Sequence, residues 1–253
     1  MTEKNVVTAI RDALHDEMAS DERVVLLGED VGARGGVFRI SAGWMEEFGE
    51  HRVIDTPLAE SGIVGVAIGM ALHGLLPVAE IEFADFIHPA FDQIVSEAAR
   101  IRYRSNGDFG VPLVIRAPCG GGIHGALYHS QSVEAFYGHV PGIKVVMPST
   151  PADSAGLLRS ALADPDPVLF LEHKKCYRAI KGEVPDGRYL TPIGAADVKR
   201  TGEDLTVVSY GYYMHLCLEA ADRLEHDEGV SVDRKSTRLN SSHSRASRMP
   251  SSA

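Results

Sequence analysis

The segment APCGGGIHGALYHSQSVEAFYGHVPG, residues 117–142, holds the densest group of side chains that could do chemistry. It follows the run VPLVIR, whose apolar character is typical of a buried strand. Three successive glycines let a backbone approach a ligand closely, and His124, His129 and Gln131 supply polar groups. We interpret this segment as a ligand-binding loop, while a glycine-rich turn with surface histidines is the alternative that the residues leave open.

A metal pair made of His124 and His129 is disfavoured, because their spacing within a loop matches no common ligand pattern. The second candidate is Glu60, in the stretch DTPLAESG at 55–62, where a predicted strand passes into a predicted helix. A carboxylate at a helix N-terminus is stabilised by the helix dipole. Glu60 is therefore either a residue that caps the helix or a functional acid.

Strand-like apolar runs alternate with helical patterns through the first part of the chain. The runs lie at 24–28, 52–56, 76–83, 111–118, 144–148 and 167–172, and the helical patterns near 6–18, 59–74, 86–104, 132–139 and 151–163. This alternation predicts an α/β fold with a mostly parallel sheet flanked by helices. Ligands bind beyond the carboxyl ends of such strands, which is where both candidate segments fall.

We predict a first domain over residues 1–180 and a linker over 181–203, where turn residues and charges replace the alternation. A second α/β domain begins at 204–232, with a strand at 204–211 and a helix at 212–229 that ends on a glycine. One strand and one helix do not enclose a core, so we expect only the first part of this second domain in the sequence, truncated before its core is complete.

Composition limits the classes of partner. The formal net charge is −10, and because residues 233–253 carry one Lys and four Arg against one Asp, the preceding 232 residues carry −14. Such an acidic body disfavours nucleic acid as a partner. Cys119, Cys176 and Cys217 form no C-x-x-C pair, and the charged N-terminal stretch lacks an apolar segment, so we expect a cytoplasmic protein that neither crosses a membrane nor is secreted.

Two familiar catalytic signatures are missing from the sequence. There is no G-x-S-x-G elbow and no P-loop. A serine hydrolase and a P-loop enzyme are therefore disfavoured.

Long motifs, in the same order, resemble the beta subunit of the thiamine-diphosphate-dependent 2-oxo acid dehydrogenases. They are GEDVGARGGVFR (28–39), RVIDTPLAESGIVGVAIGMALHGLLPVAEIEFADF (52–86), FDQIVSEAARIRYRSNG (91–107), HGALYHSQSVEAFYGHVPGIKVVMPSTPADSAGLL (124–158) and GEDLTVVSYG (202–211). The branched-chain enzyme is most similar, and the pyruvate and acetoin enzymes are related. The resemblance implies a transketolase-like pyrimidine-binding domain at 1–180, the start of a transketolase C-terminal-like domain at 204–232, and a role in branched-chain amino acid catabolism.

The resemblance also assigns roles to residues. Glu60 matches the glutamate that hydrogen-bonds the pyrimidine ring of thiamine diphosphate and tunes its proton transfer. His129 matches the histidine that faces the reacting carbon and aids acyl transfer to lipoamide. Leu58, Phe86 and Gln131 are implied cofactor contacts. Phe86 stands where the branched-chain subunit usually has a tyrosine, so the ring packing is kept without the hydroxyl.

A structural potassium ion is implied by the resemblance, held mostly by backbone carbonyls. The residues at the matching positions are Val111, Leu113, Val114, Ala161, Leu162, Asp164 and Asp166. Oxygen ligands suit such a hard cation.

The sequence contains no G-D-G segment followed by an Asn, which this family uses to hold the diphosphate through magnesium. The resemblance therefore implies that a separate alpha subunit supplies it in an α2β2 tetramer, that this chain alone is inactive, and that a lipoyl-bearing acyltransferase accepts the acyl group. A non-catalytic βαβ scaffold is the alternative of a different class. A transketolase-like enzyme would carry the diphosphate motif in the same chain, and the particular 2-oxo acid stays open.

The end of the chain, DRKSTRLNSSHSRASRMPSSA at 233–253, differs from everything before it. It matches the translation of a common sequencing-adapter oligonucleotide, and we interpret it as an assembly artefact that interrupts the strand begun by VSV. A disordered basic tail is the alternative, and a nucleic-acid-binding arm is disfavoured.

Overall fold

A six-stranded sheet forms the centre of the structure, a computed structural model that describes residues 1–123 and 125–236. The strand order is β3-β2-β4-β5-β7-β6, and every neighbouring pair is parallel. The strands are β2 (Val24–Gly28), β3 (Val53–Asp55), β4 (Leu76–Glu80), β5 (Val114–Cys119), β6 (Lys144–Val146) and β7 (Val168–His173). Each lies within or overlaps a predicted apolar run, so the predicted α/β fold with a mostly parallel sheet is confirmed.

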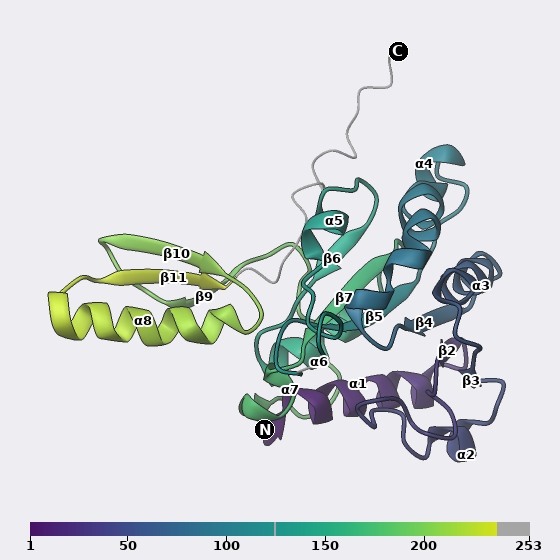
Figure 1. The fold of residues 1–253 in the computed structure, drawn as a ribbon, viewed down its shortest axis with the longest axis horizontal. Helices are drawn as coiled ribbons and strands as arrows, with labels where there is room; N and C mark the ends of the chain where they lie inside the picture. The colour runs from purple at the N-terminus through teal and green to yellow at the C-terminus, as the bar shows by residue number, and fades with distance from the viewer. Residues whose placement is uncertain (124, 237–253) are drawn as a thin grey trace, which may run out of the picture.

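Helices cover both faces of this sheet (Figure 1). Successive residues of a strand point to opposite faces, so Leu26 packs with α1 (Val6–Ser20) and α6 (Pro151–Leu162), while Leu27 packs with α3 (Glu60–Leu72). Both faces are buried, which is why the strands are almost entirely apolar in sequence. The shorter helices are α2 (Trp44–Phe48), α5 (Glu134–Gly138) and α7 (Cys176–Ala179).

The helix predicted near 86–104 is not continuous. Two 3₁₀ turns, η1 (Ala84–Phe86) and η2 (His88–Ala90), lead into the π-helical segment η3 (Gln93–Ala98) and then α4 (Ile101–Arg104). Pro89 lacks an N–H, which suits the short turn at η2 and interrupts regular helical bonding. The apolar spacing of the sequence was helical, but it does not distinguish an α-helix from these related coils.

A smaller sheet of order β10-β11-β9 follows the first domain, and α8 (Tyr213–Glu228) covers one face of it (Figure 1). Its strands are β9 (Asp197–Arg200), β10 (Leu205–Ser209) and β11 (Val232–Ser236). Gly229 adopts a left-handed φ of 68° and ends α8. The chain segment 233–236 belongs to β11, whereas the rest of the distinctive C-terminal stretch, 237–253, lies outside the described residues.

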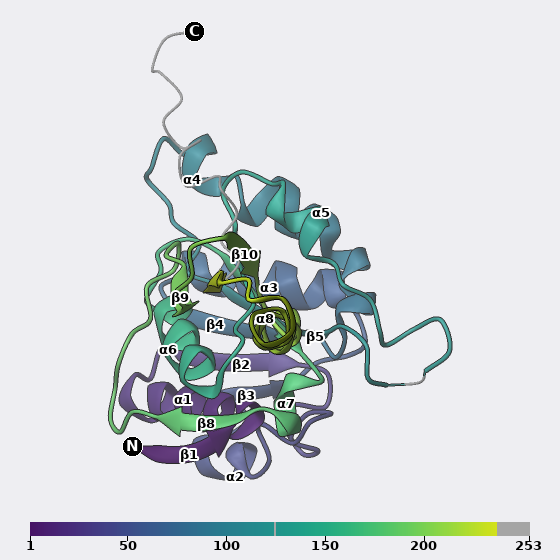
Figure 2. The same cartoon turned by 90° about the vertical axis from the view of Figure 1, so that its left-hand side faces the viewer.

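Two strands lie within the segment that the sequence predicts as a linker. One is β9, and the other is β8 (Lys181–Val184), which pairs antiparallel with β1 (Thr2–Asn5). Figure 2 shows β1 and β8 side by side. These strands are four residues long and partly exposed, so they carry too little apolar alternation for the sequence to reveal them. Within the described residues, no helix is long and apolar enough to cross a bilayer.

Candidate active site at the carboxyl edge of the sheet

Three glutamates follow three neighbouring strands at the same edge of the sheet. Glu29 comes directly after β2, Glu60 begins the helix after β3, and Glu82 comes two residues after β4. Burial, together with the nearby charges of Glu60, Glu82 and Asp30, raises the pKa of Glu29 to about 7. The edge is therefore a concentrated acidic region in which Glu29 is partly protonated at neutral pH.

Glu60 is buried, with 7% of its surface exposed, and it is the first residue of α3. The preceding residue, Ala59, provides no side-chain cap, so the exposed N–H groups of the helix and its dipole favour a negative charge at this position. Glu60 makes no side-chain hydrogen bond within the described part of the chain. A buried carboxylate of this kind has the capacity to bind a ring nitrogen of a ligand.

His129 lies on the loop after β5, and its ring is held edge-on against two phenylalanines. The ring centroids are 4.5 Å from Phe83 and 5.4 Å from Phe86. Its Nδ1 atom is buried and has no hydrogen-bond partner among the described residues. Burial and the charges of Asp30 and Glu60 raise the pKa of Glu82, whereas His129 lowers it. His129 and Glu60 therefore both lie within electrostatic range of Glu82 at this acidic edge.

The remaining predicted cofactor contacts differ in exposure. Phe86 is half-buried at the end of η1 and also lies against Tyr128, with ring centroids 6.0 Å apart. Gln131 is exposed, and its Oε1 lies 3.4 Å from His88 Nε2. Leu58 is 79% exposed in the loop before α3. The structure thus joins Glu60, His129 and Phe86 at one edge and leaves the other two side chains facing outward, while His124 lies outside the described residues.

Sequence reasoning missed four residues that shape this edge: Glu29, Glu82, Phe83 and Asp85. Their signal was position, because Glu82 and Phe83 end the predicted apolar run 76–83, and Glu29 and Asp85 follow such runs within two residues. Only the strand order makes them neighbours, since β2 lies between β3 and β4.

The residues matched to a potassium site lie around the start of β5, the end of α6 and the loop before β7. The carbonyl of Leu113 accepts from Val168 N at 2.9 Å. The carboxylate of Asp164 accepts from Lys144 Nζ at 2.7 and 2.8 Å, and that of Asp166 accepts from Arg102 Nε. Both carboxylates are neutralised by cations, so an ion here would depend on backbone carbonyl oxygens. Among the residues that the structure describes, no group of three or more His, Cys, Asp or Glu is arranged to hold a metal.

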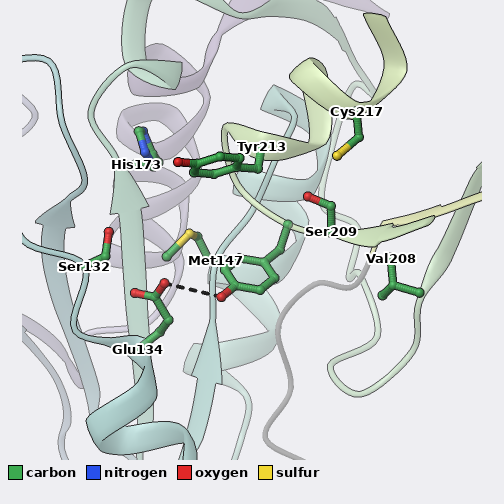
Figure 3. Close-up of a pocket in the computed structure, with 9 residues that line it drawn as sticks. Ser132, Glu134, Met147, His173, Val208, Ser209, Tyr213 and Cys217 are labelled. Carbon is green, nitrogen blue, oxygen red and sulfur yellow. Dashed lines mark hydrogen bonds between the residues drawn. The ribbon is translucent and has the colours of Figure 1, made fainter. Parts of the chain in front are cut away.

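A separate pocket of about 280 Å³ lies where β10 and α8 meet the first domain (Figure 3). Tyr210 donates from its hydroxyl to Glu134 Oε1 at 3.3 Å across this boundary. Burial, helped by the positive charges of Lys174 and Lys175, lowers the pKa of His173 to about 4, so His173 is neutral at pH 7. None of the predicted site residues lines this pocket, whose lining is Ser132, Glu134, Met147, His173, Val208, Ser209, Tyr210, Tyr213 and Cys217.

Comparison with known families agrees with this architecture. Residues 2–179 match the pyrimidine-binding domain of transketolase, and residues 194–233 match the transketolase C-terminal domain. The fold is similar to a split-gene transketolase described as an inactive beta4 tetramer, with a TM-score of 0.73 at 22% identity over 93% of this chain and 71% of that one. A transketolase from Leishmania mexicana gives a TM-score of 0.71 at 17% identity, over 99% of this chain and 36% of that one. The fold is thus that of the transketolase-like thiamine diphosphate enzymes.

Sequence relatives narrow the class. The chain is 61% identical over 232 residues to the 2-oxoisovalerate dehydrogenase subunit beta of Bacillus subtilis, covering 92% of this chain and 71% of that protein. It is 51% identical over 233 residues to the pyruvate dehydrogenase E1 component subunit beta of the same organism, with the same coverage. The corresponding pyruvate dehydrogenase subunit of Acholeplasma laidlawii is 51% identical over 228 residues, covering 90% of this chain and 69% of that protein. This chain belongs to the beta subunits of the 2-oxo acid dehydrogenases, the acyl-transferring oxidoreductases that decarboxylate 2-oxo acids.

Proposed function

We propose that this chain supplies the pyrimidine-binding half of a thiamine diphosphate site that acts on branched-chain 2-oxo acids. The observation that carries the proposal is that buried Glu60 and His129 both lie within electrostatic range of Glu82 at the carboxyl edge of the sheet. The 61% identity with a 2-oxoisovalerate dehydrogenase subunit supports the branched-chain substrate. Pyruvate is the second candidate substrate, favoured by the relatives at 51% identity.

The residues present fit the cofactor. Glu60 would share a proton with a ring nitrogen of the pyrimidine, while Phe86 would pack against the cofactor without the hydroxyl of a tyrosine. His129, whose buried Nδ1 has no partner among the described residues, would position the substrate and assist acyl transfer to the lipoyl group. When bound, thiamine diphosphate supplies the nucleophilic carbon that adds to the 2-oxo group.

A separate alpha subunit completes the site in this proposal. The sequence lacks the G-D-G segment with its following Asn, so the alpha subunit would hold the diphosphate and magnesium in an α2β2 tetramer. The exposed side chain of Val66 on α3, 54% accessible, is available for such a contact. A lipoyl-bearing acyltransferase would accept the acyl group. The backbone carbonyls around β5 and α6 would hold a potassium ion. The three free cysteines suit a protein of the reducing cytoplasm.

The experiment is a substrate panel on the tetramer reconstituted from this chain and an alpha subunit, with thiamine diphosphate and magnesium. We expect kcat/KM for 2-oxoisovalerate to exceed that for pyruvate by about tenfold or more, because added methyl groups in an apolar pocket contribute about 1 to 3 kcal/mol each. A preference for pyruvate would transfer the assignment to the pyruvate enzymes. Absence of turnover on every 2-oxo acid would contradict the proposal as a whole.

A further inference from the structure

Asp85 is a buried carboxylate placed next to the candidate site but on a different segment from His129. It is 6% exposed and forms the middle of the short turn η1. Among the residues that the structure describes, Asp85 forms no salt bridge, so an ion pair does not explain its burial. A buried carboxylate is stable only when its oxygens accept hydrogen bonds, so its partners identify its role.

Both oxygens of Asp85 bind the backbone of the loop that carries His129. Oδ1 accepts from Ser130 N at 3.3 Å, and Oδ2 accepts from Gln131 N at 3.2 Å. These two residues come directly after His129. A two-point attachment of consecutive peptide groups restricts rotation of the chain at that position, which a single hydrogen bond does not.

The backbone of His129 needs such a restraint. Its φ is 72°, in the left-handed region, which costs a residue other than glycine about 1 to 2 kcal/mol. Strain of this size persists only where surrounding contacts outweigh it. The two hydrogen bonds from Asp85 are contacts of this kind, because they hold the next two peptide groups.

The ring of His129 is restrained by the same turn. Phe86 N donates to Phe83 O at 2.9 Å and so closes η1. Phe83 and Phe86 flank Asp85 in sequence, and this turn fixes their phenyl rings, which contact the imidazole of His129. On another side, Gly125 approaches so closely that an added Cβ would lie 2.5 Å from His129 Nδ1. One turn therefore holds both the backbone and the ring of the histidine.

Lys174 offsets the charge of Asp85. It is 7% exposed, its amine has no hydrogen-bond partner among the described residues, and its Nζ lies 5.5 Å from the centroid of the Phe83 ring. Burial lowers the pKa of Lys174, while the negative charges of Cys119, if ionised, and of Asp85 act in the opposite direction. The nearby amine and the two amide donors together make an ionised carboxylate tolerable at this buried position.

We propose that Asp85 is a positioning residue for the acyl-transfer step: it clamps the two peptide groups after His129 and so keeps the imidazole directed into the site. The inference rests on the proposed function of His129. Asp85 itself touches neither substrate nor cofactor in this scheme, and its effect passes through the histidine.

The test uses the tetramer reconstituted with an alpha subunit and carrying Asp85→Asn, His129→Ala, both changes, or Asp92→Asn. Asp92 is exposed and lies in the same region of the chain, so its variant is the matched control. Two rates are measured: decarboxylation with an artificial electron acceptor, and acylation of a lipoyl domain. We expect Asp85→Asn to lower acylation by about tenfold and decarboxylation by less than about threefold, and the double variant to match His129→Ala within about twofold.

Amide hydrogen exchange at Ser130 and Gln131 gives a readout that does not depend on activity. We expect exchange about tenfold faster in Asp85→Asn and unchanged in Asp92→Asn. If Asp85→Asn does not assemble, Asp85→Glu keeps the charge beside Lys174 and displaces the clamp by one methylene, and the same faster exchange is expected.

The outcomes separate the two ideas. Unchanged exchange and normal acylation in an assembled Asp85 variant overturn the positioning role, even where His129→Ala is defective. Normal acylation in His129→Ala would contradict the proposed role of that histidine, and the clamp would then have no effect on catalysis. Faster exchange in Asp85→Asn would still establish that Asp85 restrains the loop. Additive defects in the double variant contradict action of Asp85 through His129.

Discussion

Glu60 combines burial with a position at a helix start, and these two properties lead to a first prediction. Replacing it with glutamine keeps its size but removes the acid, so we expect decarboxylation by the reconstituted tetramer to fall by about 100-fold or more while the thermal unfolding of the chain is little changed. Glu46→Gln, on the exposed first turn of α2, is the control. Turnover near the normal rate in Glu60→Gln would rule out this residue as the acid of the site.

Glu29 leads to a prediction about pH. Its pKa is about 7 in the folded chain against an ordinary 4.5, so the folded state binds the proton more tightly than the unfolded state. The contribution of this group to the free energy of unfolding is complete below pH 4.5, and it is lost as the pH rises from there through about 7. We expect Glu29→Gln to remove this loss. The difference in free energy of unfolding between the variant and the unchanged chain should therefore shift by about 2 kcal/mol in favour of the variant when the pH is raised from 5 to 8.

Chemical denaturation of both chains at the two pH values measures the effect. Parallel pH profiles for the two proteins would mean that Glu29 titrates normally. Because Glu22 is exposed and precedes β2, at the opposite end of that strand from Glu29, Glu22→Gln should retain the pH dependence of the unchanged chain.

At the scale of residues, the sequence predicted part of the candidate site. Glu60 and His129 were found because a strand end, a glycine-rich loop and a family resemblance all pointed to them. Glu29 and Glu82 were missed because each is an ordinary acidic residue in a turn, and their proximity depends on the order β3-β2-β4, which the sequence does not state. The clamp from Asp85 depends on two hydrogen bonds to residues 45 and 46 positions further along the chain.

The start of α6 shows how a local signal fixes an element. Thr150 accepts from Asp153 N at 3.1 Å through its hydroxyl, and Pro151 occupies the first helical position, where no N–H is needed. We expect Thr150→Ala to lower the free energy of unfolding by about 1 kcal/mol, measured by urea denaturation. Thr150→Ser keeps the hydroxyl and should lose much less, whereas equal losses would show that the methyl packing, not the cap, stabilises the helix.

Elements with strong apolar patterns were predictable, and those without were not. The strands β2, β4 and β7 are buried on both faces, so their apolar runs were clear in sequence. The segments β8 and β9 are charged and partly exposed, and hydrogen bonding to distant strands defines them. The chain passes through η1, η2 and η3 because of local turns around Pro89. The apolar residues there keep a helical spacing, so the sequence pattern does not reveal these turns.

For the molecule as a whole, the proposed function makes the acidic edge one part of a catalytic site that an alpha subunit completes. We expect the isolated chain not to decarboxylate 2-oxoisovalerate, and we expect calorimetry to detect association with an alpha subunit that tightens when thiamine diphosphate and magnesium are added. A non-catalytic scaffold would associate equally well with and without the cofactor. Glu60→Gln should weaken the link between cofactor and association, which ties this measurement to the site.

The pairing of β1 with β8 has a consequence for protein engineering. Thr2 lies opposite Val184, and the N-terminal amine donates to Asp186 Oδ2 at 2.5 Å, so the start of the first domain and the segment that follows its end are neighbours in space. Domains whose ends meet tolerate being rejoined by a short linker and reopened at an exposed turn. A circular permutant joined across β1 and β8 would free the N-terminus for relocation, and would allow a reporter or a tether to be attached far from the acidic edge.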